Sequence, residues 1–371
     1  PTYRVDVYRE CDIVEDILRI YGYNNIELPA NMRASINTTP KPDPERVKVM
    51  ASEFMTANGF MEMMNNSLTK SDYYANLKTY PQEKCVMVVN PLSSDLNCMR
   101  QTLLLNGLEV IAYNINRQQN DLKLYEYGNV YSFNPDFKAP EFDASNPEEA
   151  LAHRSDALKA YSEEPKFTLF ITGNGYQSWR NKTVSGNFFA LKGYLELLLS
   201  KFGITLANLE YEAAPSDLFA EGLVYKMNGG KEIAVMGTIS KARLKQFGIK
   251  QPVFAAEISW NVLLKAVKKN KVQYSELPKF PEVKRDLALL LDENVSFAEL
   301  RKSALSTEKK LLKSVTLFDV YKGDKIPEGK KQYALSFVLQ DMEKTLNDKA
   351  VEAVMGKLLA TFQHKHGATL R

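Results

Sequence analysis

The chain has 371 residues, of which 44% are hydrophobic and 25% are charged, and its formal net charge is +3. This length exceeds what one compact core holds, so we expect roughly two or three domains of ordinary soluble composition. The near-neutral balance does not by itself indicate a nucleic-acid partner. No apolar run is long enough for a membrane span, and there is no secretory signal. The start at Pro1, without Met, indicates a fragment of a longer protein.

The cysteines and histidines do not indicate a metal centre. Cys11, Cys85 and Cys98 are far apart and form no Cys-x-x-Cys pair, which predicts reduced thiols in a cytoplasmic protein. His364 and His366 fit the last turn of a helix, where cationic side chains are favoured.

The first predicted elements are a short strand at residues 3–7 and a helix at residues 12–21 that Gly22 ends. Ile13, Ile17 and Ile20 are predicted to form the buried stripe of that helix. Residues 1–28 are taken as one piece, and the proline-containing residues 29–42 as a linker.

Four acidic residues in or near this helix are candidates for a metal site. Asp12, Glu15 and Asp16 share one face near the helix start, and Asp6 can approach them from the preceding strand. The helix dipole favours carboxylates there whatever their role. Clustered carboxylates without His or Cys also suit a hard cation such as Mg²⁺. The residues alone leave both interpretations open.

Residues 43–270 predict an α+β domain on a largely antiparallel sheet. A helix begins at Pro44 after Asp43, because proline is favoured at the first helical position. Further helices are expected after residue 100 and at 188–202, 241–247 and 259–268. Strands are expected at 60–68, 86–89, 122–127 with 130–131, 167–172, 223–226, 233–239 and 253–258. The polar stretch 134–165 is interpreted as an excursion or a partner-contacting insert.

No catalytic constellation emerges from this region. Gly173 and Gly175 with Arg180 are the one combination typical of a nucleotide-binding loop, but a polar loop follows them, so we interpret them as a strand-end turn. Arg100 is expected to be structural. There is no Walker loop, no Gly-x-Ser-x-Gly elbow and no His beside a nucleophile. We therefore predict no catalytic residue.

Residues 278–371 predict a complete small module, separated from the core at about residues 270–277. Strands are indicated by alternation at 287–291 and 333–339, and another by apolar residues between 311 and 317. Ser296 and Glu299 form a capping box, and Asn347 caps the last helix. The order is βαββαβ, the ferredoxin-like split.

In such a module two helices cover one sheet face and the other stays open. The open face is predicted to carry small residues and one ring, Phe318, with Lys279, Arg285, Lys330 and Lys331 along its rim. A flat face with a ring and cations can stack unpaired bases and hold phosphates. The charge excess is small, so a protein-docking or simply solvated face remains an alternative.

Several segments closely resemble the β subunits of bacterial phenylalanyl-tRNA synthetases. In the C-terminal module the resemblance lies in the run from Phe318 to Gly323 and in the segment that starts the last helix. At the N-terminus it lies in residues 4–7 and 20–24. In the middle it lies in residues 90–94 with 99–100, in residues 124–130 and in residues 188–193. Together these segments cover nearly the whole chain.

The resemblance implies a class II synthetase-like core that is itself non-catalytic, followed by a ferredoxin-like anticodon-binding domain. It implies an α2β2 enzyme that joins phenylalanine to tRNA(Phe) with ATP and Mg²⁺, in which this chain alone is inactive. It also implies that Asp6, Asp12, Glu15 and Asp16 contribute to a magnesium site shared with the α subunit. The competing hypotheses are a protein-interaction scaffold that never meets RNA and a free-standing ATP-dependent ligase.

Overall fold

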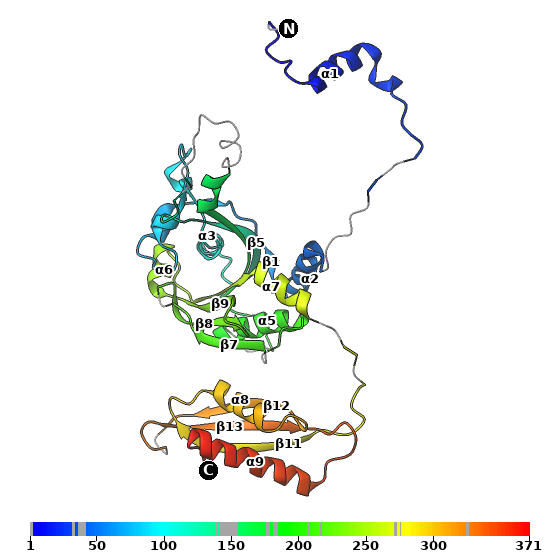
Figure 1. Cartoon of the computed structure of the whole chain (residues 1–371). Helices are drawn as coiled ribbons and strands as arrows, with labels where there is room; N and C mark the ends of the chain where they lie inside the picture. The colour runs from blue at the N-terminus through cyan, green and yellow to red at the C-terminus, as the bar shows by residue number, and fades with distance from the viewer. Residues whose placement is uncertain are drawn as a thin grey trace. The chain divides into compact units, whose positions relative to one another are not determined.

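The computed structural model describes residues 3–31, 34–35, 42–138, 140, 155–175, 179–180, 185–205, 208–215, 217–270, 273–274, 276–323 and 326–371. The chain divides into two compact units, Pro1–Val272 and Gln273–Arg371 (Figure 1). Each unit is described by itself.

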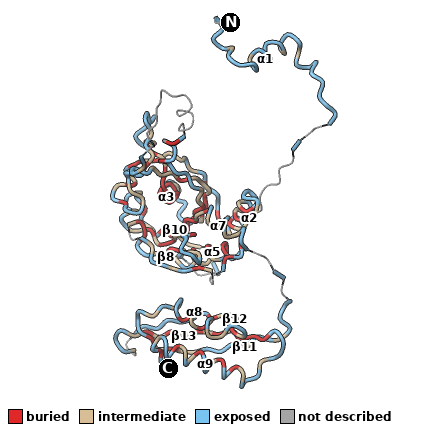
Figure 2. The backbone as a smooth tube through the Cα atoms, viewed as in Figure 1, coloured by how far each residue is buried: buried red, intermediate tan, exposed pale blue. Residues whose placement is uncertain are grey.

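The N-terminal helix differs from its prediction in one respect. Helix α1 spans Glu10–Tyr21 and a 3-10 turn follows at Tyr23–Asn25, but none of the α1 residues is buried (Figure 2). Ile13, Ile17 and Ile20 are 54%, 58% and 91% exposed, so the predicted buried stripe is wrong. The predicted strand at residues 3–7 is also wrong, because the described part of this segment consists of turns.

The first unit is built on a seven-stranded sheet. Its strand order is β1-β5-β6-β10-β9-β8-β7. Only the short β1–β5 pairing is parallel and every other neighbouring pair is antiparallel, so the prediction of a largely antiparallel α+β domain is confirmed. The strands are β1 Met61–Glu62, β5 Leu122–Phe133, β6 Tyr161–Thr172, β7 Leu209–Ala213, β8 Phe219–Met227, β9 Glu232–Ile239 and β10 Val253–Ser259.

Helices bury both faces of this sheet. One apolar cluster joins the sheet to α2, α5 and α7, and a second joins its other face to α3 and α6 (Figure 2). Leu124 and Tyr125, neighbours on β5, belong to different clusters because successive strand residues point to opposite faces. The helices are α2 Pro44–Ala57, α3 Leu104–Ile115, α5 Phe188–Lys201, α6 Lys241–Gln246 and α7 Trp260–Lys269.

A small second sheet lies in residues 68–99. Its order is β2-β4-β3, from strands Leu68–Thr69, Cys98–Met99 and Val86–Met87. Residues 60–68 were expected to form one strand, but they split between β1 and β2. Short 3-10 turns lie at Ser71–Tyr74, Gln82–Lys84, Ser94–Leu96 and Asp156–Ala160.

The polar stretch 134–165 is not an insert throughout. Strand β6 already begins at Tyr161 and pairs with β5 along its whole length, so residues 161–165 belong to the sheet. Residues 139 and 141–154 lie outside the described part of the chain.

The second unit has the predicted βαββαβ order. Its four-stranded sheet is fully antiparallel with the order β12-β13-β11-β14, and the boundary falls between Val272 and Gln273. The elements are β11 Val283–Asp292, α8 Phe297–Thr307, β12 Leu312–Tyr321, β13 Lys330–Leu339, α9 Asp348–His366 and β14 Thr369–Leu370.

Both helices of this unit begin as their sequences predict. The Glu299 amide donates to Ser296 Oγ at 3.3 Å, and Glu299 Oε2 accepts from the Ser296 amide at 2.8 Å, which completes the capping box. Asn347 Oδ1 accepts from the Ala350 amide at 2.9 Å at the start of α9. These caps satisfy amides that have no partner inside the helix.

Candidate functional site

The C-terminal sheet has one covered and one open face. On β13 buried and partly exposed residues alternate without a break. Tyr333 and Leu335 lie opposite Leu289 and Leu287 on the side that packs against α8 and α9. The opposite parity places small side chains such as Ala334 on the open side, so this part of the prediction is confirmed.

A β-bulge in β12 changes which residues reach the open face. Leu317 lies opposite Leu335, but the next paired residue is Asp319, opposite Ala334, so Phe318 is the extra residue. Phe318 is 59% exposed. Because a bulge places two residues against one, the Phe318 ring and the Asp319 carboxylate share the open side. Simple alternation from Phe318 would point Asp319 to the covered face. The sequence therefore did not predict Asp319 on the open face.

Two more residues reach the open face without having been predicted. Tyr321 lies opposite Gln332 and is 38% exposed. The backbone amide of Arg371 donates to the Ala288 carbonyl at 3.1 Å, and its guanidinium bonds to Gln332 Oε1. The signal for Arg371 was the last strand itself, since the edge strand β14 pairs with β11 and places Arg371 beside that strand.

Two of the predicted cations, one partly exposed and one exposed, are paired with carboxylates. Lys330 Nζ lies 2.6 Å from Asp292 Oδ1, and these two residues face each other across β13 and β11 on the open side. Lys279 lies before β11 and its ammonium is 3.6 Å from Glu276 Oε2. Both ion pairs are solvent-exposed and therefore weak.

Arg285 does not line the open face. It lies opposite Phe337, whose side chain is buried on the helix-covered side. Its guanidinium is 3.2 Å from the carboxylate of Asp348, the first residue of α9. The predicted position at the open rim is therefore wrong, because strand parity sends this side chain to the helices.

Lys331 does not line the open face either. It is only 6% exposed, and its ammonium donates to the Glu293 carbonyl at 2.8 Å and lies 4.6 Å from the centre of the Tyr333 ring. Lys331 has the same parity as Tyr333, so it points to the covered side and closes the end of the core.

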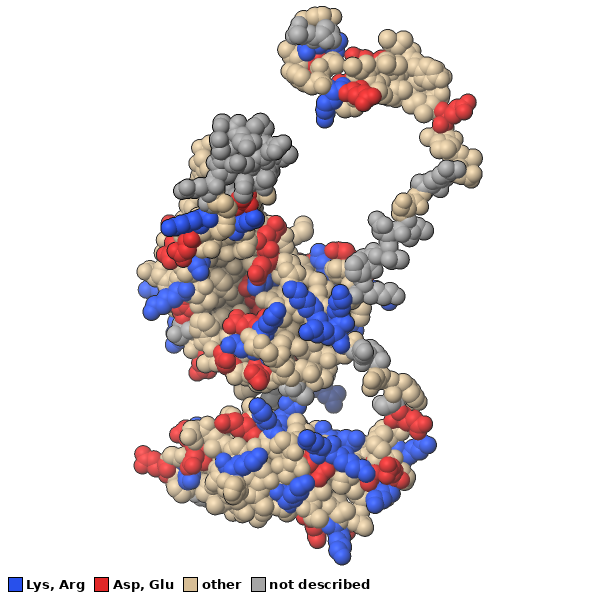
Figure 3. Space-filling model, in the orientation of Figure 1, with Lys and Arg blue, Asp and Glu red and all other residues tan. Residues whose placement is uncertain are grey.

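The charge on the open face is mixed. The register places there the cations Lys284, Lys330 and Arg371 and the acids Asp286, Asp292 and Asp319. Figure 3 shows basic and acidic side chains interspersed over the visible side of this unit. An open face of mixed charge attracts phosphates only weakly.

The N-terminal acids do not converge on one point. Asp12 Oδ2 accepts from the amides of Tyr8 and Arg9 at 3.0 and 2.8 Å, and these bonds hold the pKa of Asp12 below its ordinary value. Asp12 thus caps its own helix instead of pointing to a ligand.

Arginines engage the other three acids. Arg4 lies 3.1 Å from Asp6 and 3.6 Å from Asp16, and Arg19 lies 2.8 Å from Glu15. Within the described residues no group of three or more acidic, His or Cys side chains is arranged to hold a metal ion. The residues present therefore do not fit Mg²⁺ by themselves.

The arginine that the sequence singled out in the first unit forms a buried ion pair. Arg100 is 2% exposed, its Nη1 lies 2.8 Å from Glu126 Oε1, and its Nε donates to the Asn129 carbonyl at 3.0 Å. This buried pair joins the segment before α3 to β5. Arg100 is therefore structural, as predicted.

The glycine turn after β6 is also committed to the fold. The Asn174 amide, which a phosphate-binding turn would direct at its ligand, donates to Asp121 Oδ1 at 2.7 Å. A carboxylate at this position repels phosphate. Trp179 and Arg180 are exposed, and residues 176–178 and 181–184 on either side of them lie outside the described part of the chain.

Comparisons with known proteins agree with this geometry. Residues 28–260 match the model of the phenylalanyl tRNA synthetase beta chain CLM domain, which is more than half of the chain. The chain belongs to the phenylalanyl-tRNA synthetase β chain family. Residues 278–371 match the ferredoxin-fold anticodon binding domain, and residues 1–23 match the tRNA synthetase B5 domain.

Members of this family align with the chain over its full length. The phenylalanine–tRNA ligase β subunits of Bacteroides thetaiotaomicron, Bacteroides fragilis and Porphyromonas gingivalis are 47%, 45% and 43% identical, each over 100% of this chain. The chain spans 44% of the length of each of these relatives.

A solved pyrrolysyl-tRNA synthetase from Desulfitobacterium hafniense is similar to this chain at 13% identity, over 60% of this chain and 68% of that one. Its TM-score of 0.42 does not decide the fold of the core. Among the described residues, no helix combines the length and apolarity that crossing a bilayer requires.

Proposed function

We propose that this chain is a non-catalytic, tRNA-contacting portion of a phenylalanine–tRNA ligase β subunit. The whole enzyme would attach phenylalanine to tRNA(Phe) with ATP, and this chain would supply a scaffold and an RNA-binding face. The support is the family membership together with the name that the relatives carry.

The domain assignment follows from this proposal. Residues 1–28 would end the small domain before the core, and residues 29–42 would link it to a class II synthetase-like core at 43–270. Residues 278–371 would bind the anticodon. The antiparallel sheet and the separate ferredoxin-fold unit support this division.

The observation that carries the RNA proposal is the open face of the C-terminal sheet. Phe318 and Tyr321 offer exposed rings, and the Asp319 carboxylate lies on the same side. Aromatic rings on an open sheet can stack unpaired bases, and a carboxylate can accept hydrogen bonds from base amino and imino groups. Because the face is not basic overall, we propose that it holds a single-stranded loop and not a duplex backbone.

The core would act as a scaffold. Arg100 and the glycine turn after β6 are the two features considered for nucleotide binding. Both are held by other groups of the fold. Exposed apolar side chains are frequent in residues 61–92, where Met61, Met64, Val89 and Leu92 are 56%, 93%, 91% and 104% exposed. We propose that this segment contacts the α subunit, since large obligate interfaces are hydrophobic.

The test is fluorescence anisotropy with a tRNA(Phe) anticodon stem-loop, on the chain alone and with the α subunit co-expressed. Phe318→Ala and Tyr321→Ala should each weaken binding by about 1–3 kcal/mol, which is about 5- to 150-fold. Tyr113→Ala is the matched control, because this ring is 57% exposed on α3 in the other unit. It should leave the affinity unchanged.

Two results would favour the competing hypotheses. No saturable binding of the stem-loop, either by the chain alone or with the α subunit, would support a protein-interaction scaffold without RNA contact, and equal affinity for all three variants would remove Phe318 and Tyr321 from the RNA contact. Saturable ATP binding by the chain, measured by calorimetry, would support a free-standing ligase.

A further inference from the structure

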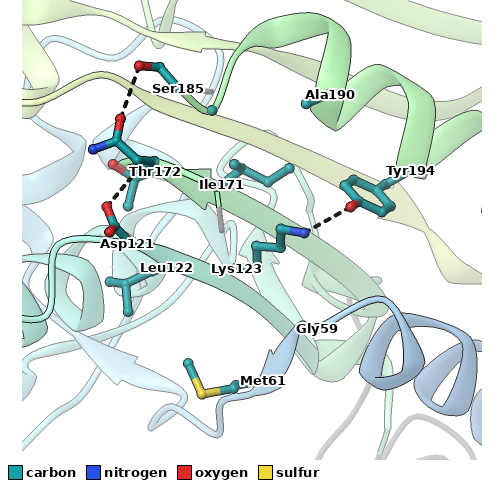
Figure 4. Close-up of a pocket in the computed structure, with 13 residues that line it drawn as sticks. Gly59, Met61, Asp121, Leu122, Lys123, Ile171, Thr172, Ser185, Ala190 and Tyr194 are labelled. Carbon is teal, nitrogen blue, oxygen red and sulfur yellow. Dashed lines mark hydrogen bonds between the residues drawn. The ribbon is translucent and has the colours of Figure 1, made fainter. Parts of the chain in front are cut away.

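A pocket in the first unit has two charged residues in its wall, and the fold already uses both. It lies between the start of α5 and the adjacent ends of β5 and β6 (Figure 4). The Lys123 ammonium donates to the Tyr194 hydroxyl at 2.8 Å and to the Asn58 carbonyl at 3.4 Å. The Asp121 carboxylate accepts from the Asn174 amide at 2.7 Å. Both charges are therefore engaged within the fold.

A cation without an acidic partner lies on the open face of the C-terminal sheet. Arg371 follows β14 directly and is exposed, and no carboxylate of the described residues lies within ion-pair distance of its guanidinium. Lys330 on the same face differs, because its ammonium is 2.6 Å from Asp292 Oδ1. Arg371 therefore retains a charge that can bind an external anion.

Gln332 orients this guanidinium without neutralising it. Arg371 Nη1 donates to Gln332 Oε1, an uncharged acceptor on β13. Because β11 lies between β14 and β13, the Arg371 side chain extends over β11 toward β12. Gln332 itself lies opposite Tyr321 of β12. The cation is therefore directed toward the strand that carries the exposed rings.

Small side chains leave room for a ligand between the cation and the Asp319 carboxylate. The strand register aligns Arg371 with Ala288, Ala288 with Ala334, and Ala334 with Asp319, so these positions form one row across the four strands. Neighbouring strands are about 4.8 Å apart, so the backbones at the two ends of the row are about 14 Å apart. Only the methyl groups of two alanines stand between them in this row.

We propose that Arg371 binds the phosphate of a nucleotide whose base stacks on the exposed rings of β12. This contact rests on the RNA-binding function proposed above and belongs to the same face. The guanidinium fork matches two oxygens of one phosphate. Base and phosphate are opposite ends of a nucleotide, so a nucleotide spans the row between Asp319 and Arg371. The Asp319 carboxylate repels phosphate and accepts hydrogen bonds from a base, which fixes the direction in which the nucleotide lies.

The salt dependence of RNA binding tests this proposal. The affinity of the 371-residue chain for a tRNA(Phe) anticodon stem-loop is measured by fluorescence anisotropy at several salt concentrations. Each phosphate neutralised on a single strand contributes about 0.7 to the slope of log Kd against log salt concentration. Arg371→Met should lower this slope by about 0.7 and weaken binding about tenfold. Phe318→Ala should weaken binding at an unchanged slope, because a stacked base releases no counterion.

Three further variants separate the phosphate contact from other effects of charge. Lys357→Met removes the same charge from α9, on the covered side of the sheet, and should leave both slope and affinity unchanged. Gln332→Glu supplies the guanidinium with an internal carboxylate and should lower the slope as Arg371→Met does. Arg371→Lys should keep most of the slope but lose affinity, because an ammonium is a point charge that cannot form the fork.

An unchanged slope for Arg371→Met would overturn the proposal even if the affinity fell, because the arginine would then contact a base or only support the face. Equal losses for Arg371→Met and Lys357→Met would overturn it as well, since net charge alone would explain them. If Arg371→Met does not fold, as judged by its thermal transition, Gln332→Glu decides the question. A loss for Phe318→Ala with no change for Arg371→Met would remove only the phosphate contact, whereas no stem-loop binding by the unaltered chain would remove the RNA function too.

Discussion

Replacing Glu126 by alanine should cost the first unit a large part of its stability. The side chains of Arg100 and Glu126 are 3% and 1% exposed, so the variant leaves a guanidinium buried without its carboxylate. Glu126 also accepts from the Asn65 amide at 3.1 Å and from its side-chain nitrogen at 2.7 Å. Both Asn65 donors lose this acceptor, and Arg100 Nη1 keeps only its 3.4 Å bond to the Asn66 carbonyl.

The expected magnitude follows from this burial. Removing one partner of a buried ion pair costs about 3–5 kcal/mol, because the remaining charge is uncompensated. Arg100 keeps its bond to the Asn129 carbonyl, which limits the loss. Glu126→Gln keeps the shape and an acceptor oxygen, so its loss should lie between zero and that of the alanine variant. The control is Asp95→Ala, whose 2.9 Å pair with Lys70 is solvent-exposed and should cost less than about 1 kcal/mol.

Urea unfolding followed by tryptophan fluorescence isolates the relevant unit. The chain has 2 tryptophans, Trp179 and Trp260, and both precede the boundary at Val272, so the C-terminal unit is silent. A loss for Glu126→Ala no larger than that for Asp95→Ala would refute the view of Arg100 as a buried structural group. It would reopen the question of a role in ligand binding.

Three further predictions concern stability. Burial raises the pKa of Glu257 above its ordinary value of 4.5, so the folded state retains a proton and loses stability as pH rises from about 4.5 through the folded pKa. Glu257→Gln should gain stability relative to the parent chain over that window, in urea titrations at successive pH values. A Cβ on Gly107 would lie 2.2 Å from Phe170 Cζ, so Gly107→Ala should lose about 1–3 kcal/mol despite the higher helix propensity of alanine, whereas Gly193→Ala in α5 meets no atom within 4 Å and should gain up to about 1 kcal/mol. Ser296→Ala should lose about 1 kcal/mol of cap energy and speed hydrogen exchange in α8.

Each of these has a contradicting outcome. A constant stability difference across the pH series would mean that Glu257 ionises normally in the fold. A gain in stability for Gly107→Ala would mean that α3 does not pack tightly on the sheet, and a loss for Gly193→Ala would mean that this site on α5 is not open. Unchanged exchange in α8 would mean that the Ser296 hydroxyl contributes nothing to the helix.

Sequence signals within a few residues predicted the helix starts and the strand faces that depend on neighbouring residues alone. The cap and proline at Asp43 and Pro44 placed the start of α2, and strict alternation placed β13 and its covered face. These signals are complete within a few residues. That is why the order βαββαβ and the covered side of the sheet could be predicted from the chain.

Features that depend on a distant partner could not be predicted. The bulge at Phe318 exists only relative to β13, and it decides that Asp319 and Tyr321 share the open side. Lys331 is a different case, because it shares the parity of Tyr333 and Leu335 within β13, so the alternation itself indicated the covered side and the predicted rim position did not follow that alternation.

The segment at residues 60–68 and the helix α1 show the same limit. The segment breaks into two strands where Asn65 binds Glu126, a contact 61 residues away in sequence. In α1 the spacing of Ile13 and Ile17 indicates an apolar face, but spacing carries no information on whether anything in this chain covers it.

The extra residue in β12 has a consequence for how this surface can diversify. Removing Phe318 would bring Leu317 and Asp319 into regular succession, and every pairing on either side would keep its partner. Deletion of this one residue would therefore remove the exposed ring of Phe318 and leave Asp319 and Tyr321 opposite their present partners. At this position of β12, aromatic contact area can be gained or lost without a change in the fold of the domain.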